Sequence, residues 1–214
     1  MIPVGGKPLL EHTIDHLARQ GIHEVVLNLH HLPDAIISHF GDGARWGMSF
    51  RYSQEDAILG TAGAVRRAAP HFSGPFVVWY GDNLSHCRLE RMWALHSARG
   101  ATLSLAVFER EHVEQSGIVG FDPLSGRIER FLEKPSPAAV FGRWVSAGIM
   151  ILDTSIVAAI PRDRASDFGR DVLPDLLARG EPLFAHPLGP DEGLWWIDTP
   201  RDLEYVQAHW RAPR

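Results

Sequence analysis

The feature that most constrains the fold is the alternation of strand-like and helix-like segments in the first half of the chain. Helix-spaced apolar residues at Leu9, Leu10, Ile14 and Leu17 end before Gly21, a typical helix stop. Strand-like runs at 24–30, 49–54, 75–82 and 102–109 alternate with further helical segments at 33–41, 62–72 and 88–100. Strands that alternate with helices predict an α/β fold with a doubly wound, mostly parallel sheet.

In the second half, predicted strands joined by turns replace the regular alternation of strands and helices. Strands are expected at 117–122, 126–135 and 144–152, with a hairpin-type turn at "PLSGR". Two helices are expected near 155–160 and 168–179, then a strand at 183–187 and a last helix beginning at Thr199-Pro200. No long polar linker interrupts the chain, so residues 1–214 are predicted to form a single α/β domain with a β-rich second half.

Composition excludes several classes of protein. The net charge is −5 and charged residues make up 22% of the chain, unlike a polycationic nucleic-acid binder. The single Cys87 rules out an internal disulfide framework. No apolar run approaches the roughly 20 residues that span a bilayer, and the N-terminus lacks the pattern of a signal peptide. We therefore expect a cytoplasmic protein that binds neither nucleic acid nor membrane.

Two segments of the first half could carry chemistry. "VVWYGDN" places Asp82 after the end of an apolar strand, where open α/β sheets bind ligands, although Asp82 could equally cap the following loop. "LGTAGAVRRA" puts Gly60 and Gly63 around Thr61-Ala62 at the start of a helix. Such a loop can approach a planar base or a phosphate, and its alternative interpretation is an ordinary turn and helix cap.

Two segments of the second half offer charged groups. "FLEKPS" ends a strand with Glu133, suited to sugar hydroxyls, beside Lys134, suited to a phosphate; a solvated charge pair is the alternative. "WWIDTP" places Asp198 at the end of an apolar segment. If Asp82 and Asp198 converge, they form a site of hard oxygen ligands for Mg²⁺, but periodicity does not show that they converge.

Taken in order, these segments resemble one family, the sugar-1-phosphate nucleotidyltransferases that make NDP-sugars. The resemblance is to the group that includes mannose-1-phosphate guanylyltransferase and glucose-1-phosphate thymidylyltransferase. It covers essentially the whole chain and rests on eight collinear segments: "PVGGKPLLEHTIDHL", "VVLNLHHLPDAIISHF", "YSQEDAILGTAGAV", "WYGDN", "RFLEKPS", "SAGIMIL", "DFGRDVLPDLL" and "WWIDTPRDL".

The resemblance implies a role for individual residues. The nucleobase loop corresponds to Leu59, Gly60, Thr61 and Gly63, with Glu55 upstream. Asp82 and Asp198 correspond to the carboxylates that bind catalytic Mg²⁺, and Asp82, Lys134 and Asp198 form the implied catalytic set. Sugar contacts correspond to Glu133, Lys134 and Gly148. Residues 1–116 would form the nucleotide-binding part and residues 117–214 the sugar-binding part.

The sequence departs from the family pattern at three places. Ser146 stands where the family usually has Asn, and Asp198 directly precedes Thr199, where the family often inserts two residues. The third departure is larger: the chain has no G-G-x-G-T-R-L loop, which in the family wraps the triphosphate, and no Pro-Lys before "PVGGKP". A start codon assigned too late, or a fragment, would explain this.

The implied activity is transfer of a nucleotidyl group from an NTP to a sugar 1-phosphate with release of pyrophosphate, and "LGTAGA" favours GTP and mannose 1-phosphate. Without the triphosphate loop we expect slow turnover. The alternative is a non-catalytic regulatory subunit or sugar-nucleotide sensor of the same fold. A homo-oligomer is a further expectation from the family. Since the family's first strand lies between the strands at 25–29 and 76–80, those two should pair directly or leave a gap.

Overall fold

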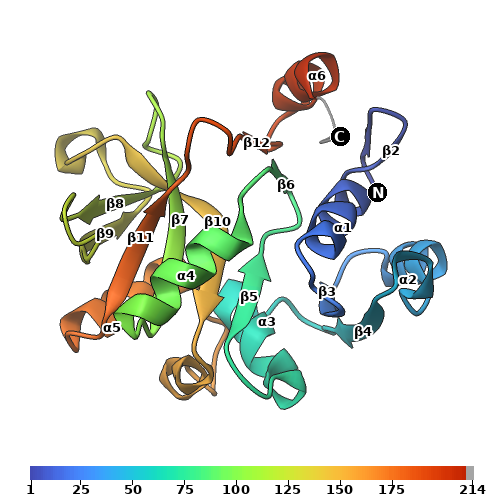
Figure 1. The fold of residues 1–214 in the computed structure, drawn as a ribbon, viewed down its shortest axis with the longest axis horizontal. Coiled ribbons are helices and arrows are strands. Elements are labelled where there is room, and N and C mark those ends of the chain that lie inside the picture. Colours follow the sequence, from blue (N-terminus) through green and yellow to red (C-terminus); the bar gives the residue numbers. More distant parts are fainter. Residues whose placement is uncertain (211–214) are drawn as a thin grey trace. The chain divides into compact units, whose positions relative to one another are not determined.

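The computed structural model describes residues 1–210, and the chain folds into two compact units, each described by itself below (Figure 1). The first unit contains residues 1–56, 79–89 and those from 189 onward. The second contains residues 57–78 and 90–188. Among residues 1–210, no helix is both long and apolar enough to cross a membrane.

The first unit consists of short strands and three helices. Its elements are β1 (Pro3–Val4), β2 (Lys7–Pro8), α1 (Leu9–Arg19), β3 (Glu24–Leu29), α2 (Pro33–Phe40), the 3-10 helix η1 (Ala44–Trp46), β4 (Ser49–Gln54), β6 (Asn83–Ser85), β12 (Leu194–Trp196) and α6 (Pro200–His209). The helices α1, α2 and α6 and the strands β3 and β4 lie where the sequence predicts them, whereas the β1–β2 hairpin and β6 were not predicted.

Strand β3 runs parallel to β4, in register from Glu24 opposite Ser49 to Leu29 opposite Gln54. Among residues 1–210, β3 has no strand partner on its other edge. It therefore does not pair with the strand at 76–79, so the direct pairing that the sequence allowed is not found among the described residues.

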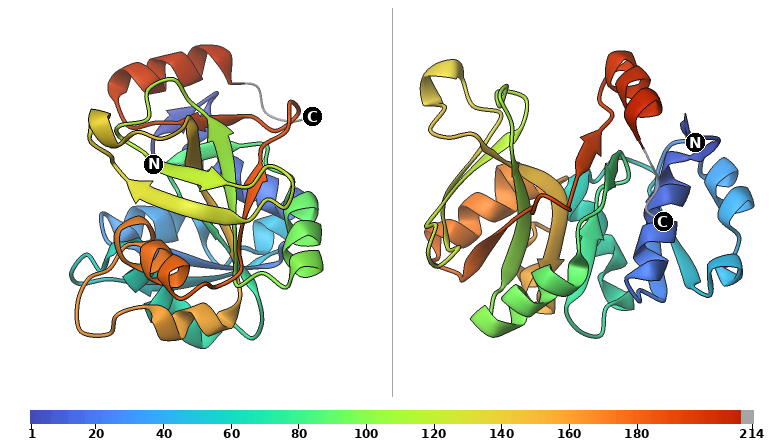
Figure 2. Two further views of the ribbon diagram at one scale, coloured as in Figure 1. Left: turned by 90° about the vertical axis from the view of Figure 1, so that its left-hand side faces the viewer. Right: turned by 45° about the horizontal axis from the view of Figure 1, so that its top comes forward.

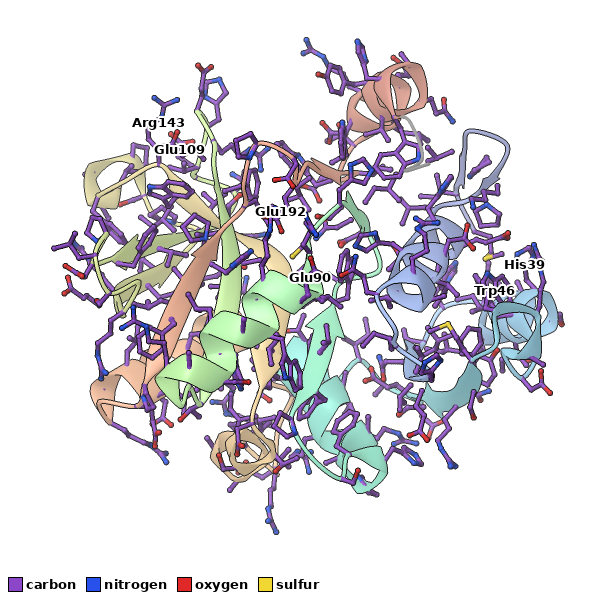
Figure 3. All side chains as sticks on the ribbon, viewed as in Figure 1. His39, Trp46, Glu90, Glu109, Arg143 and Glu192 are labelled. Carbon is purple, nitrogen blue, oxygen red and sulfur yellow. The ribbon has the colours of Figure 1, made fainter. Side chains whose placement is uncertain are left out.

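Charged side chains hold α1 against its neighbours. The buried Glu11 carboxylate accepts from Arg45 Nη2 at 2.8 Å and lies 2.7 Å from His39 Nε2. One turn further, Asp15 accepts from the indole of Trp46 at 2.8 Å and pairs with Lys7. His39 and Trp46 extend from α2 and η1 in Figure 3. Because both carboxylates are paired, these contacts offset the cost of removing them from water, and they tie α2 and η1 to α1.

The amino end of α6 is fixed by a capping box. Thr199 Oγ1 accepts from the Asp202 amide while the Asp202 carboxylate accepts from the Thr199 amide, and Pro200 occupies the first helical position. Val206 and Trp210 then pack on Val4, Leu9 and Leu84. The expected N-cap at Thr199-Pro200 is confirmed, and α6 closes the small core of the first unit.

The second unit is built on a six-stranded sheet (Figure 2). Its elements are α3 (Gly60–Ala68), η2 (Ala69–His71), β5 (Phe76–Trp79), α4 (Leu89–Arg99), β7 (Leu103–Glu109), β8 (Gly117–Phe121), β9 (Ile128–Glu133), η3 (Pro137–Ala139), β10 (Trp144–Leu152), η4 (Thr154–Ala159), η5 (Phe168–Val172), α5 (Leu173–Ala178) and β11 (Leu183–Pro187). The strand order is β11-β7-β10-β8-β9, with β5 also paired to β10.

Strand β7 is an interior strand of this sheet, between β11 and β10. It pairs parallel to β11 and antiparallel to β10, and its residues 103–107 are completely or almost completely buried on both faces. Each fully buried Leu or Val there contributes about 1.5–3 kcal/mol. Its one buried hydroxyl, Ser104, bonds to His96 of α4 at 3.0 Å, and α4 lies across the sheet in Figure 1. The apolar run at 102–109 is therefore a buried central strand, as its composition predicts.

The predicted α/β class is correct, and two helices of the second half differ in type. The segment expected at 155–160 is a 3-10 helix, and the one expected at 168–179 opens as the π-helical turn η5 before α5. Pro174 has no amide to donate and its ring crowds the preceding turn, which favours a wider turn before it. The two compact units do not follow the boundary at residue 116, so the division into nucleotide and sugar parts stays a prediction.

Stability should fall on acidification because of two buried histidines on α1. Burial is the largest influence on His12 and His16 and lowers the pKa of each below its usual value. The unfolded chain then binds more protons, so stability is complete above the ordinary histidine pKa of about 6.5 and decreases as pH falls below it. Urea unfolding at pH 7.5, 6.5 and 5.5 should show this decrease. His16→Gln, which keeps a donor for the Cys87 carbonyl, should reduce the pH slope; an unchanged slope would contradict the assignment.

Candidate functional site

Two predicted carboxylates lie together in the first unit. Strands β6 and β12 pair antiparallel, with Trp196 opposite Asn83. Asp82 immediately precedes β6 and Asp198 lies two residues beyond β12, so the ladder brings both side chains to the same end of the pair. Both residues are exposed. The sequence alone could not show that Asp82 and Asp198 lie together. They do so because β6 pairs with β12, a strand more than 100 residues later in the chain.

The two carboxylates influence each other electrostatically. Although the surface of Asp82 reaches solvent, the protein atoms around it remove part of its solvation and raise its pKa above its usual range, and the negative charge of Asp198 raises the pKa further. Two like charges held close together repel, and a divalent cation between them would remove that repulsion. Carboxylate oxygens are the ligands that Mg²⁺ prefers. The donor set at this end of β6 and β12 therefore fits Mg²⁺.

In the second unit, Glu133 and Lys134 stand at the end of β9. Glu133 is its last residue and is half-buried; burial raises the pKa of its carboxyl, while Lys134 and Arg170 lower it. Lys134 is exposed and has φ of 46°, a left-handed conformation that is uncommon outside glycine. Its amide donates to the Ser116 carbonyl at 3.1 Å. The backbone turn separates the two side chains, with the carboxylate inward and the ammonium in solvent, and strain of this kind is typical of binding sites.

Gly148 lies in a bulge of β10. The register of β10 against β7 shifts between Ser146 and Met150, and Gly148 has φ of 68°. Its amide donates to Ser146 Oγ at 3.3 Å. The serine that replaces the family's usual Asn thus supports the bulge itself. Bulges interrupt a ladder and redirect the strand, which leaves backbone at Gly148 outside the regular pairing.

The predicted nucleotide loop forms the amino end of α3. Gly60 has φ of 77°, and a Cβ there would lie 2.5 Å from the Ser166 carbonyl oxygen. Thr61 donates through its amide and its hydroxyl to Asp167 Oδ1, each at 3.1 Å. The Ala62 and Gly63 amides both donate to the Ser166 carbonyl, at 2.9 and 3.1 Å. The loop is therefore rigidly tied to Ser166 and Asp167.

The amides of this loop have acceptors within the protein. The loop could have bound a phosphate through the free amides of a helix N-terminus. Instead, the amides of residues 61, 62 and 63 donate within the protein. A phosphate would find the donors of residues 61, 62 and 63 already engaged. Its assignment to a nucleobase stays a prediction.

Glu55 belongs to the first unit, at the end of β4. It is buried, its amide donates to the Leu29 carbonyl at 2.8 Å, and its carbonyl oxygen lies 2.9 Å from His30 Nδ1. The structure thus brings Asp82 and Asp198 together in one unit, and Thr61 and Glu133 onto one supporting segment in the other. It fixes Glu55 within the first unit only.

Sequence reasoning missed the supporting segment itself. Ser166, Asp167 and Gly169 contact both predicted subsites of the second unit, yet the motif "DFGRDVLPDLL" was only one of the collinear segments and had no role of its own. The signal that could have found it is an acidic residue next to a glycine just before a helix. Such a pair is common in loops, so the signal is weak without the fold.

Comparison with known proteins gives a consistent result. The sequence model of one protein family, described as "Nucleotidyl transferase", matches residues 1–210. The chain is 31% identical over 222 residues to the UTP–glucose-1-phosphate uridylyltransferase of Synechocystis sp., covering 97% of this chain and 56% of that protein. It is 33% identical over 211 residues to the probable mannose-1-phosphate guanylyltransferase 2 of Arabidopsis thaliana, covering 94% and 56%. The chain spans about half the length of these curated relatives.

Solved structures support the fold. HddC from Yersinia pseudotuberculosis superimposes with a TM-score of 0.79 at 22% identity, over 99% of this chain and 89% of that one. A putative glucose-1-phosphate thymidylyltransferase from Bacillus anthracis superimposes with a TM-score of 0.84 at 20% identity, over 96% and 83%. At these identities the likeness establishes the α/β fold.

Gly60→Ala should destabilise the second unit. An alanine would have to adopt a positive φ and would place its Cβ against the Ser166 carbonyl, so we expect a loss of roughly 1–3 kcal/mol or more. Gly74→Ala is the matched control, because a Cβ there meets nothing within 4 Å. Guanidinium unfolding of the two variants measures the difference. Equal stabilities would show that the loop does not need this close approach.

Proposed function

This chain belongs to the nucleotidyl transferase family, and on that premise we propose that it transfers a nucleotidyl group from a nucleoside triphosphate to a sugar 1-phosphate. The products would be an NDP-sugar and pyrophosphate. The observation that carries the proposal is the paired carboxylates Asp82 and Asp198 at one end of the β6–β12 pair. Glu133 and Lys134 support it with groups suited to a sugar and its phosphate.

Each group would have a distinct part in binding. Asp82 and Asp198 would hold Mg²⁺, which when bound supplies positive charge against phosphate oxygens. Glu133 would accept hydrogen bonds from sugar hydroxyls, and the exposed Lys134 ammonium would pair with the sugar phosphate. Leu59, Gly60, Thr61 and Gly63, with Glu55, would hold the nucleobase, and Gly148 would lie against the sugar.

The reaction would proceed without a covalent protein intermediate. A phosphate oxygen of the sugar 1-phosphate attacks the α-phosphorus in line, the bond to the bridging oxygen breaks, and pyrophosphate leaves. The protein's part is to orient two anions and to neutralise their charge. The one cysteine does not offer a nucleophile, because burial and the nearby Glu192 raise the pKa of Cys87 to about 12.

For the substrates we propose GTP and mannose 1-phosphate. The support is the "LGTAGA" loop and the likeness to proteins named as mannose-1-phosphate guanylyltransferases from Arabidopsis thaliana and Mycobacterium tuberculosis. The competing choice is UTP and glucose 1-phosphate, after the uridylyltransferase relative. Pyrophosphate release measured with each NTP and sugar 1-phosphate pair would decide between them.

Turnover by residues 1–214 alone should be orders of magnitude slower than by a relative that carries a G-G-x-G-T-R segment. The chain contains no such segment, and each missing charge-assisted hydrogen bond to phosphate is worth about 1.5–3 kcal/mol. Rapid pyrophosphate release from this chain would contradict the expectation. Sugar-nucleotide binding that needs no Mg²⁺ and leads to no turnover would instead support the regulatory or sensor role.

Removing either paired carboxylate should weaken metal binding and the activity that depends on it. Asp82→Asn and Asp198→Asn should each lower kcat/KM by roughly 100-fold or more, since even indirect partners of a metal contribute about 10- to 100-fold. Mn²⁺ binding followed by electron paramagnetic resonance gives a readout independent of turnover. Asp34→Asn, an exposed carboxylate in the first turn of α2, is the control and should bind Mn²⁺ like the wild type. Equal Mn²⁺ binding by all variants would refute the site.

A further inference from the structure

The segment Ser166–Gly169 contacts the nucleotide loop through both backbone and side chain. The Ser166 amide donates to the Leu59 carbonyl at 2.8 Å, and its carbonyl accepts from two amides of the first turn of α3. Asp167 Oδ1 accepts from the Thr61 amide and hydroxyl. The Thr61 hydroxyl in turn accepts from the Phe168 amide at 3.0 Å. With its proton and one lone pair engaged, Thr61 has a fixed rotamer.

The same segment is packed against the sugar carboxylate. A Cβ at Gly169 would lie 2.5 Å from Glu133 Oε2, and a Cβ at Gly117 would lie 2.7 Å from the same atom. The Glu133 carboxylate therefore occupies a slot that exists only because both positions lack a side chain. The π-helical turn η5 begins at Phe168 and places Gly169 against the end of β9.

Charges along the segment act on both subsites. The negative charge of Asp167 raises the pKa of Glu133 and the positive charge of Arg170 lowers it, beside the larger effect of burial. The segment is itself held in place: the Asp167 amide donates to Asp171 Oδ2 at 2.8 Å, and Asp171 pairs with Arg164 at 2.7 Å. Asp167 thus stands between two ligand-binding groups on a backbone that has little freedom to move.

We infer that Ser166–Gly169 is a positioning segment that couples the nucleotide loop to the sugar carboxylate in one sense: both are held by the same short backbone, each through its own residue. Asp167 sets the position of Thr61 and its loop, and Gly169 sets the position of Glu133. Neither residue contacts the reacting atoms. This inference rests on the proposed function and deepens it, because it assigns selectivity for each substrate to a different residue of one short segment.

Direct binding of the two substrates to the 214-residue chain tests the coupling. Calorimetry with GTP and Mg²⁺, and separately with mannose 1-phosphate, gives a dissociation constant for each. Asp167→Ala should raise the dissociation constant of GTP about tenfold, which corresponds to about 1.4 kcal/mol of binding free energy. It should leave the dissociation constant of mannose 1-phosphate within about twofold of the wild-type value. Gly169→Ala should show the opposite pattern, because its methyl group displaces the Glu133 carboxylate.

Two further variants separate positioning from general loss of structure. Asp167→Asn keeps an acceptor for Thr61 and should recover most of the GTP affinity. Asp153→Ala is the matched control, because Asp153 caps η4 by accepting from the Ser155 amide at 2.8 Å in the same unit. It should leave both dissociation constants unchanged. If Asp167→Ala does not fold, Asp167→Ser, whose shorter side chain does not reach both Thr61 donors, is compared with Asp153→Ser, and hydrogen exchange should be faster only in the former, at the Thr61 and Phe168 amides.

The outcomes are distinguishable. Selective weakening of one substrate by each variant supports the coupling. If the wild type binds both substrates and the variants leave both dissociation constants unchanged, the coupling is overturned and the proposed function stays intact. The same holds if each variant weakens the binding of both substrates equally. A wild-type chain that binds neither substrate overturns the proposed function, and the coupling with it.

Discussion

The amides at the amino end of α3 need acceptors, and the second unit is organised around supplying them. A helix leaves its first amides without partners, and burying them unpaired would be costly. The acceptors come from Ser166 and Asp167, about 100 residues later in the chain. This requirement draws the loop before α5 onto the start of α3. It also engages the amides of residues 61, 62 and 63 within the protein, so they are not available to a phosphate.

The central strand β7 makes that arrangement rigid. With both faces buried and both edges paired, β7 anchors β10 on one side and β11 on the other. The ends of the neighbouring elements can then carry strained or interrupted backbone, as at Lys134 and at the Gly148 bulge. The strained positions of the unit thus lie at its proposed binding groups, where a stable core compensates for their cost.

In the first unit, the main constraint is the repulsion between two carboxylates. Its carboxylates at 82 and 198 repel each other, and they are held together by a short antiparallel ladder and by the packing of α6 on α1. The capping box at Thr199 begins α6 immediately after Asp198 and so limits the freedom of that carboxylate. A pair of like charges maintained by the fold is the arrangement that a divalent cation stabilises.

Much of the fold could be predicted from local patterns. Apolar runs and helical spacing located β3, β4, β7, β11, α1, α2 and α4 closely, since each depends on its own residues. Helices were expected near 155–160 and 168–179, but the 3-10 type at 154–159 and the π-helical type at 168–172 were not predicted, because hydrophobic period does not distinguish these types in so short a segment. The β1–β2 hairpin and β6 were missed because strands of two or three residues leave almost no pattern.

The sequence by itself determined the α/β class, the family and the chemical identity of the proposed binding groups, because these depend on residue type and order. Only the tertiary structure decided which groups meet. Asp82 and Asp198 converge through a strand pairing, and Thr61 and Glu133 share a support through Asp167 and Gly169. The physical reason is that pairing and close approach join residues 36 to 116 positions apart, and hydrogen bonds and steric fit at that range leave no periodic trace in the chain.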